Sequence, residues 1–290
     1  MFNGALTALV TPFRDGEVDA PALRDLIEWQ IQSGIDGLVP CGSTGESATL
    51  THAEHDNVIK LTIEQARKRV PVIAGTGSNS TAEAIRLTAA AREMGADGAL
   101  LLSPYYNKPT QDGIFKHYKT IAASVDLPLF VYNIPGRTAS NILPETIARL
   151  AEIKNIVGIK EASASMDQSS DILKMCGDRI TILSGDDALT VPLMALGAKG
   201  VISTCSNIVP REMHDLAAAA SAGDFAKARE IHYRLLPLIR SLFVETNPIC
   251  IKQAVAFMGK CANELRMPLV PMTAAPAERL RIAMKELRLI

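Results

Sequence analysis

The sequence predicts an α/β protein built as a (β/α)8 TIM barrel with a C-terminal helical appendage. Eight short apolar runs alternate along the chain with segments in which apolar residues recur every three or four positions, the spacing of a buried helix face. The runs are almost continuously apolar, as strands covered on both faces of a parallel sheet are. An open, doubly wound sheet shows a similar alternation and is the competing architecture, but eight strand–helix repeats favour the barrel.

The predicted strands are short and lie along most of the chain. They are GALTALV (4–10), GLVP (37–40), PVIAG (71–75), GALLLS (98–103), PLFVYN (128–133), IVGIK (156–160), ITILSG (180–185) and GVIS (200–203). The first predicted helix carries Leu23, Leu26, Ile27 and Ile31 on one face, which is the pattern of a helix packed against a sheet.

Glycine pairs mark several joints between a helix and the next strand. They occur in GIDGL (34–38), GADGA (95–99) and GAKGV (197–201). In each, the first glycine follows a predicted helix, where a left-handed backbone conformation commonly ends the helix. The repetition supports a chain built from similar strand–helix units.

The strand pattern stops near Gly223, and three helical segments follow. They are 225–243, 251–265 and 275–287. We therefore expect two domains, a catalytic barrel over 1–223 and a C-terminal helical domain over 224–290.

Composition excludes several classes of function. The 290 residues carry a formal net charge of −1 and are 48% hydrophobic, so neither a nucleic-acid-binding surface nor an anionic-membrane partner is indicated. No apolar stretch reaches the ~20 residues of a membrane span, and the N-terminal MFNGALTALVTPF reads as a first strand rather than a signal peptide. The five cysteines are scattered, which predicts reduced thiols in a cytoplasmic protein.

A lysine ends the sixth predicted strand, in NIVGIKEAS (155–163). The interpretation without a chemical role is a lysine that extends to solvent or pairs with Glu161. Strand alternation, however, points Glu161 to the opposite face. In a barrel, the carboxyl ends of the strands form the active-site mouth, where burial favours a neutral amine. At the usual pKa of ~10.4, about one amine in 2,500 is neutral at pH 7, whereas a pKa near 8 gives roughly one in ten. Lys160 is therefore a candidate Schiff-base nucleophile.

Two neighbouring segments complete the candidate site. Tyr132 ends the fifth strand, where it is either a core aromatic or a group that gives and takes protons. GSTGE (42–46) follows the second strand and offers backbone N–H groups and two hydroxyls to a small carboxylate. No cofactor is expected: GTGSNS (75–80) lacks the third glycine of a dinucleotide fingerprint, and His52 and His55 have no evident third metal ligand.

Several motifs together resemble the dihydrodipicolinate synthase family over essentially the full chain. They are GSTGES (42–47), PYYNKP (104–109), YNIPGRT (132–138), GIKEAS (158–163) and LSGDD (183–187), in the order and at the intervals of that family. The resemblance implies a pyruvate-dependent class I aldolase-type enzyme on a (β/α)8 barrel.

The resemblance also implies catalytic roles. Lys160 matches the lysine that forms a Schiff base with pyruvate, and Tyr132, Thr44 and Tyr106 match a proton relay in which Tyr106 comes from the partner subunit of a dimer. Backbone N–H groups at Ser43 and Thr44 would hold the pyruvate carboxylate, and the Ile202 region would line the site.

The second substrate is the point on which members of this superfamily differ. Synthases often have two threonines in the loop, whereas Ser43 and Thr44 form the pair found in related N-acetylneuraminate lyases. Arg137, in the YN-x-P-x-R-T pattern that synthases use to bind L-aspartate 4-semialdehyde, favours condensation of this aldehyde with pyruvate in lysine biosynthesis. The alternatives are a lyase acting on N-acetylneuraminate or a keto-deoxy sugar acid, and a catalytically silent barrel that senses a keto acid, which would need no proton relay.

The resemblance further implies a homotetramer, arranged as a dimer of dimers, and feedback inhibition by L-lysine. Thr51 with Glu54 and Ser80 with Glu83 have the spacing of capping boxes, and capping is the bland role for these residues. In lysine-regulated relatives, however, the inhibitor contacts residues at the positions of Ser47, Ala48, His52, His55, Asn79, Glu83 and Tyr105. Glu83 would receive the α-ammonium of lysine, and Tyr105 and Asn79 its carboxylate.

Overall fold

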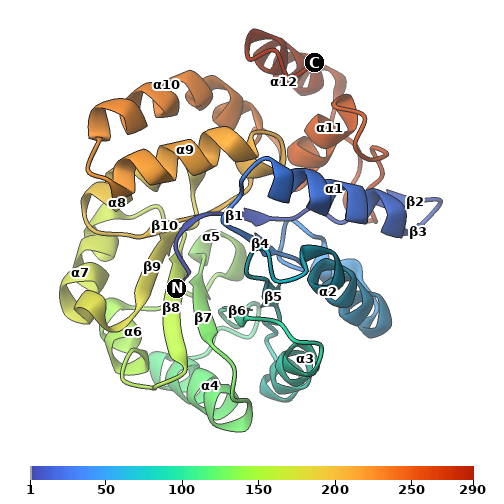
Figure 1. The fold of residues 1–290 in the computed structure, drawn as a ribbon. Coiled ribbons are helices and arrows are strands. Elements are labelled where there is room, and N and C mark those ends of the chain that lie inside the picture. Colours follow the sequence, from blue (N-terminus) through green and yellow to red (C-terminus); the bar gives the residue numbers. More distant parts are fainter. Residues whose placement is uncertain (1) are drawn as a thin grey trace.

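The computed structural model describes residues 2–290, which form a ring of parallel strands surrounded by helices (Figure 1). The strands of the ring are β1 (Gly4–Ala8), β4 (Gly37–Val39), β5 (Ile73–Gly75), β6 (Gly98–Leu102), β7 (Leu129–Asn133), β8 (Ile156–Glu161), β9 (Thr181–Ser184) and β10 (Gly200–Ser203). Their order is β4-β1-β10-β9-β8-β7-β6-β5. A parallel bridge between Leu38 and Val72 brings the two ends together. The predicted barrel is confirmed, and the open sheet is wrong.

Helices follow the strands, and all of them except the short α5 lie around the outside of the ring (Figure 1). They are α1 (Ala20–Gln32), α2 (His52–Ala66), α3 (Thr81–Glu93), α4 (Gln111–Ser124), α5 (Pro135–Thr138), α6 (Pro144–Leu150), α7 (Met166–Cys176), α8 (Thr190–Ala195) and α9 (Pro210–Ser221). A two-stranded hairpin, β2 (Phe13–Arg14) and β3 (Glu17–Val18), precedes α1. Leu23, Leu26 and Ile27 are buried on α1, as the apolar spacing predicted.

Alternation along the strands divides the core into two layers. The inner cluster fills the barrel with side chains that include Leu6, Ile73, Phe130 and Leu183. The outer cluster lies between the strands and the helices and extends into the C-terminal helices. A strand buried on both faces needs apolar residues at successive positions, which explains the continuous runs in the sequence.

The glycine joints have the predicted backbone conformation. Gly34, Gly95 and Gly197 lie just after α1, α3 and α8 and have φ of +86°, +91° and +120°. Residues with a Cβ rarely adopt these values, so glycine lets each helix end sharply before the next strand.

Three further helices lie beyond α9: α10 (Phe225–Ser241), α11 (Ile249–Phe257) and α12 (Ala274–Glu286). In Figure 1, α10 runs beside α9, while α11 and α12 extend past α1. The second of these helices is shorter than predicted, because the chain leaves the helix at Met258 and turns through Gly259 at φ +70°. The division of the chain into domains at residue 223 stays a prediction.

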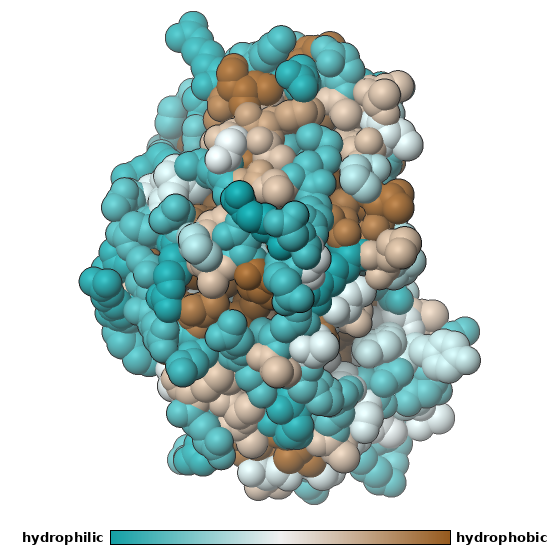
Figure 2. All heavy atoms as spheres, turned by 90° about the vertical axis from the view of Figure 1, so that its right-hand side faces the viewer, coloured by the Kyte–Doolittle hydropathy of each residue, from teal (hydrophilic) through white to brown (hydrophobic). Residues whose placement is uncertain are grey.

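The outer surface is mixed in character. Figure 2 shows one face on which hydrophilic residues predominate and apolar residues gather in separate patches. Within residues 2–290, no helix has the combination of length and apolar character needed to cross the bilayer.

Candidate active site

Lys160 points into the mouth of the barrel because of its register. Its Cα pairs with that of Tyr132 on β7 and that of Leu183 on β9, and both of those side chains belong to the inner cluster. Neighbours in register share a face of a sheet. The Lys160 Nζ lies 4.4 Å from the centroid of the Tyr132 ring.

Glu161 takes no part in this site, as strand alternation predicted. One oxygen of its carboxylate accepts a hydrogen bond from Asn133 Nδ2 at 3.1 Å, and the other accepts from the backbone N–H of Ser163 at 2.6 Å. Lys160 is thus left without a carboxylate partner on its own strand.

Burial changes the protonation of Lys160. The residue is 6% exposed, and loss of hydration lowers the pKa of Lys160 to about 8. The carboxylate of Asp187 opposes this shift, and the Arg137 guanidinium adds to it. At neutral pH, roughly one molecule in ten therefore carries the nucleophilic amine.

Tyr132 has the opposite electrostatic character. Burial raises the pKa of the Tyr132 phenol to about 12, and Arg137 reduces the shift. The phenol is therefore protonated at neutral pH and can donate a hydrogen bond or a proton. The aromatic ring also packs in the inner core, so the core role considered for Tyr132 is confirmed, and its chemical role stays a prediction.

Lys160 and Tyr132 line a cavity of about 230 Å³. Its wall comes from seven strands of the ring or the residues that follow them, and from the segment between α10 and α11. The lining residues are Ala8, Val39, Gly42, Ser43, Thr44, Leu100, Tyr132, Ile134, Arg137, Lys160, Ala162, Gly185, Asp186, Thr204, Phe243 and Asn247. The structure thus brings together five of the predicted site residues.

The GSTGE loop presents free backbone donors to this cavity. Among residues 2–290, the amides of Ser43 and Thr44 have no acceptor in the protein, whereas those of Gly45 and Glu46 donate to Gly42 O and Ser43 O. The side chain of Thr44 is fixed, because its Oγ1 accepts from Asn247 Nδ2 at 2.9 Å. Two adjacent free N–H groups suit a carboxylate.

Arg137 lies on the short helix α5, directly after β7. Its Nη2 donates to the backbone oxygen of Asn247 at 2.7 Å, and the residue lines the cavity. Asn247 therefore contacts two predicted site residues, Thr44 and Arg137. Its isolated position in the sequence, far from every strand end, gave no signal of this role.

Two residues of the SGDD segment were quoted without a role in the sequence and have one in the structure. A Cβ on Gly185 would lie 3.1 Å from Lys160 Cε and 2.6 Å from Ala162 Cβ, so glycine leaves room for the lysine. Asp187 is buried and its Oδ2 accepts from the amides of Thr204 and Cys205, at 3.1 and 3.0 Å.

Two predicted residues lie outside the cavity wall. Ile202 is buried in the inner cluster of the barrel, two positions before Thr204, which does line the cavity. Tyr106 is 87% exposed, with φ +70°. Its side chain projects into solvent in the single chain.

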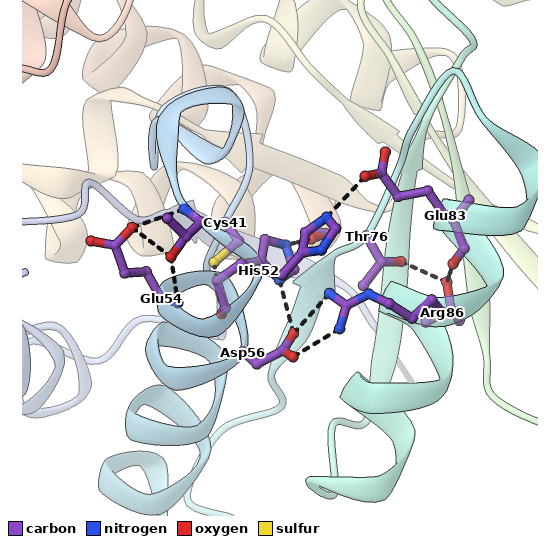
Figure 3. A network of polar contacts seen from close by, with 12 residues as sticks. Cys41, His52, Glu54, Asp56, Thr76, Glu83 and Arg86 are labelled. Carbon is purple, nitrogen blue, oxygen red and sulfur yellow. Dashed lines mark hydrogen bonds and ion pairs between the residues drawn. The ribbon is translucent and has the colours of Figure 1, made fainter.

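Six of the seven residues of the predicted lysine site line a second cavity of about 480 Å³. Its lining includes Ser47, Ala48, His52, His55, Glu83 and Tyr105. Figure 3 shows His52 on α2 reaching across to Glu83 on α3, with the ring Nε2 2.9 Å from Glu83 Oε1. Asn79 lies alongside, and its Nδ2 donates to the backbone oxygen of Tyr105 at 3.1 Å.

The capping expectations have different outcomes. The Thr51–Glu54 capping box is confirmed. The second box is wrong: Ser80 accepts from the Glu83 amide, but the Glu83 carboxylate accepts from Ser78 Oγ at 2.5 Å instead of returning to the cap. The hydrogen bond from Ser78 lowers the pKa of Glu83 below its usual value, and the hydrogen bond from His52 adds a smaller effect in the same direction. Glu83 is therefore an ionised carboxylate within the second cavity.

His55 faces the interior of the protein from α2. It is buried, and its Nε2 lies 2.9 Å from the backbone oxygen of Gly75. Burial lowers the pKa of His55, so the ring is neutral at pH 7.

Comparisons with known proteins agree with this geometry. Residues 1–287 match the sequence model of the "Dihydrodipicolinate synthetase family". The 4-hydroxy-tetrahydrodipicolinate synthase of Syntrophus aciditrophicus is 58% identical over the whole of both chains. The dihydrodipicolinate synthase of Acinetobacter baumannii, solved in complex with pyruvate, has a TM-score of 0.99 and 45% identity over 100% of both chains. The enzyme of Cyanidioschyzon merolae, solved with lysine bound, has a TM-score of 0.97 and 40% identity over 100% of this chain and 99% of that one.

Proposed function

The chain belongs to the dihydrodipicolinate synthetase family, and from that premise we propose how it condenses pyruvate with L-aspartate 4-semialdehyde to form 4-hydroxy-tetrahydrodipicolinate in lysine biosynthesis. The observation that carries the mechanism is a buried lysine of lowered pKa in a cavity that also holds a phenol, two free backbone amides and an arginine. Each of these groups has a part in the reaction.

The first step is attack by the neutral Lys160 amine on the ketone carbon of pyruvate. The resulting carbinolamine loses water and becomes a protonated imine, joined through the former ketone carbon. The hydroxyl that leaves needs a proton, and the Tyr132 phenol, which is protonated at neutral pH and belongs to the residue beside Lys160, would supply it.

The second step uses the positive imine as an electron sink. The methyl group of pyruvate loses a proton, and the C–H electrons form an enamine. The enamine carbon attacks the aldehyde carbon, and the alkoxide takes up a proton. The amino group of the product then displaces Lys160 from the imine carbon and closes the ring, which regenerates the free amine.

Substrate carboxylates are held on two sides of the cavity. The free N–H groups of Ser43 and Thr44 receive that of pyruvate, because they are adjacent and have no other acceptor among residues 2–290. Arg137 receives that of the aldehyde through a charge-assisted hydrogen bond. Asn247 fixes the arginine through a backbone oxygen, so the guanidinium is positioned before the substrate enters.

Proton exchange is proposed to run through Thr44, Tyr132 and the Tyr106 of a partner subunit. Thr44 Oγ1 already accepts from Asn247 Nδ2, which leaves its own hydrogen free to donate. The 87% exposure of Tyr106 fits a side chain that enters a neighbouring subunit. A dimer is the minimal unit that this relay requires, and a tetramer would pair two such dimers.

Feedback inhibition by L-lysine is a further part of the proposal. The ionised Glu83 would receive the α-ammonium, and the hydroxyl of Tyr105 the carboxylate. The Asn79 amide already binds the backbone of Tyr105, so its role would be to hold that tyrosine.

The five cysteines are all free, which fits a reducing, cytoplasmic setting.

The test compares substrates in the purified protein. Turnover is measured with pyruvate plus L-aspartate 4-semialdehyde, and cleavage is measured with N-acetylneuraminate, at equal enzyme concentration. We expect turnover with pyruvate plus L-aspartate 4-semialdehyde and no cleavage of N-acetylneuraminate. Cleavage of N-acetylneuraminate instead would support the lyase alternative, and pyruvate binding without turnover would support the sensor.

A further inference from the structure

A buried ion pair lies behind the active-site loop, between two residues that the mechanism does not use. Lys252, on α11, is 0% exposed, and the side chain of Glu46, in the GSTGE loop, is 1% exposed. The lysine Nζ contacts Glu46 Oε1 and also donates to the backbone oxygen of Thr11 at 2.7 Å. It lies 4.2 Å from the centroid of the Phe13 ring. This lysine therefore has its donors satisfied and does not line the substrate cavity.

Both oxygens of the Glu46 carboxylate bind the C-terminal region. Oε1 contacts Lys252, and Oε2 accepts from the backbone N–H of Arg266 at 3.0 Å. The backbone of Glu46 is left-handed, with φ +54°, a conformation that residues with a Cβ rarely adopt. The two contacts hold the residue in this conformation.

The preceding residues of the loop are anchored in the same way. The backbone oxygen of Gly45 accepts from Thr11 Oγ1 at 2.7 Å, and Thr44 Oγ1 accepts from Asn247 Nδ2. Apart from hydrogen bonds within residues 42–49, the partners of residues 44–46 are Thr11 in the barrel and three residues of the C-terminal region, Asn247, Lys252 and Arg266. Most of the contacts that anchor residues 44–46 from outside the loop therefore come from residues 247–266.

Stability alone is a weak reason for such a pair. Two charges lose their hydration on burial, and replacing a buried ion pair by neutral side chains of similar volume is often neutral or stabilising. An ion pair does, however, fix the direction of both side chains. A pair joining the C-terminal helices to the active-site loop is thus suited to holding the loop in one conformation.

We propose that Glu46 and Lys252 are positioning residues, through which the C-terminal helices hold the loop 42–47 in the conformation that binds the pyruvate carboxylate. The inference rests on the proposed function, because it assigns the carboxylate to the Ser43 and Thr44 amides. It gives α11 and the 258–266 segment a role in catalysis without placing either in contact with substrate.

The experiment replaces both members of the pair, so that no unpaired charge remains buried. In Glu46→Gln/Lys252→Met, the pyruvate concentration that gives half-maximal borohydride labelling of Lys160 should rise roughly tenfold or more, the order expected when carboxylate-binding amides are misplaced. The turnover number at saturating pyruvate should change less than this concentration does. A purely structural role would lower the active fraction and leave the half-labelling concentration unchanged.

The matched control is Lys227→Met/Glu230→Gln. This pair lies on α10 with both side chains at least half exposed, and its Nζ–Oε2 distance is 3.0 Å. The control should label like the parent. If the folded Glu46→Gln/Lys252→Met variant labels within about twofold of the parent concentration, the positioning role is wrong. Absence of labelling in the parent would instead reject the proposed Schiff base, so the two failures are distinguishable.

A second variant decides the question if the double variant does not fold. Asn247→Ala removes the side-chain hydrogen bond to Thr44 Oγ1 and leaves the ion pair intact. It should also raise the half-labelling concentration for pyruvate. An unchanged concentration would show that the C-terminal region does not position the loop.

Discussion

The Lys160 ammonium nitrogen lies 4.4 Å from the centroid of the Tyr132 ring, and the Cα atoms of the two residues are direct partners across β7 and β8. Burial acts in opposite directions on this pair: it lowers the pKa of Lys160 to about 8 and raises the pKa of Tyr132 to about 12. At neutral pH, the amine is neutral in roughly one molecule in ten and the phenol is protonated. The pair therefore places a nucleophile beside a proton donor.

Imine formation should follow the protonation of Lys160. Because only the neutral amine attacks pyruvate, the rate should rise with pH and level off above about 8, the pKa of Lys160. Asp187→Asn should move the midpoint to lower pH, since the carboxylate of Asp187 favours the ammonium form. The control is Asp186→Asn, the adjacent cavity-lining carboxylate, which should leave the midpoint in place. A midpoint near 10 in the parent would contradict the account. The measurement is the rate of pyruvate imine formation across the pH range.

Arg137→Ala should weaken the use of the aldehyde far more than that of pyruvate. Losing a charge-assisted hydrogen bond costs ~1.5–3 kcal/mol, roughly 10- to 150-fold in KM for L-aspartate 4-semialdehyde. Steady-state kinetics with each substrate varied in turn measure this. Arg149→Ala, on α6, removes an exposed arginine as a control. An equal penalty on both substrates would mean that Arg137 only supports the loop through Asn247.

Tyr106→Phe should slow turnover while the labelling of Lys160 by pyruvate persists, because the role proposed for the partner's phenol is proton transfer rather than binding. Dissociation into monomers should slow turnover in the same way. Tyr233→Phe, another exposed tyrosine, is the control. Activity and mass are measured together by dilution assays and sedimentation. Full activity in a demonstrated monomer would contradict the intersubunit relay.

The barrel and its lysine could be predicted because each depends on local pattern. Strands buried on both faces need unbroken apolar runs, and Lys160 interrupts such a run at a strand end. The predicted helix over 251–265 extends past the end of the observed helix, because the apolar spacing in the sequence persists beyond Gly259. The backbone conformation of Gly259 turns the chain there.

The partners of the site residues could not be read from the chain. Asn247 is 203 positions from Thr44, and Lys252 is 206 positions from Glu46. Neither belongs to a repeating pattern, and only folding brings them to the barrel mouth. The second capping box failed for a related reason: Ser78 and His52 compete for the carboxylate of Glu83, and His52 comes from another helix.

L-Lysine at millimolar concentration should inhibit the parent protein, and Glu83→Ala should be much less sensitive. The ionised carboxylate of Glu83 is the group proposed to bind the α-ammonium of the inhibitor. Glu93→Ala, at the exposed far end of the same helix, is the control. Activity against lysine concentration is measured for all three. An unaffected parent, or equal inhibition of Glu83→Ala, would reduce Glu83 to a residue that joins α3 to α2.

The most direct test of the central claim is the site of the pyruvate adduct. The protein is incubated with pyruvate and borohydride, digested, and its peptides are analysed by mass spectrometry. The account predicts one reduced pyruvyl group on Lys160 and none in Lys160→Ala. Lys252 is the internal control, since it is also buried but bound to Glu46, and it should stay unmodified. An unmodified Lys160, or an adduct on any other lysine, would contradict the account.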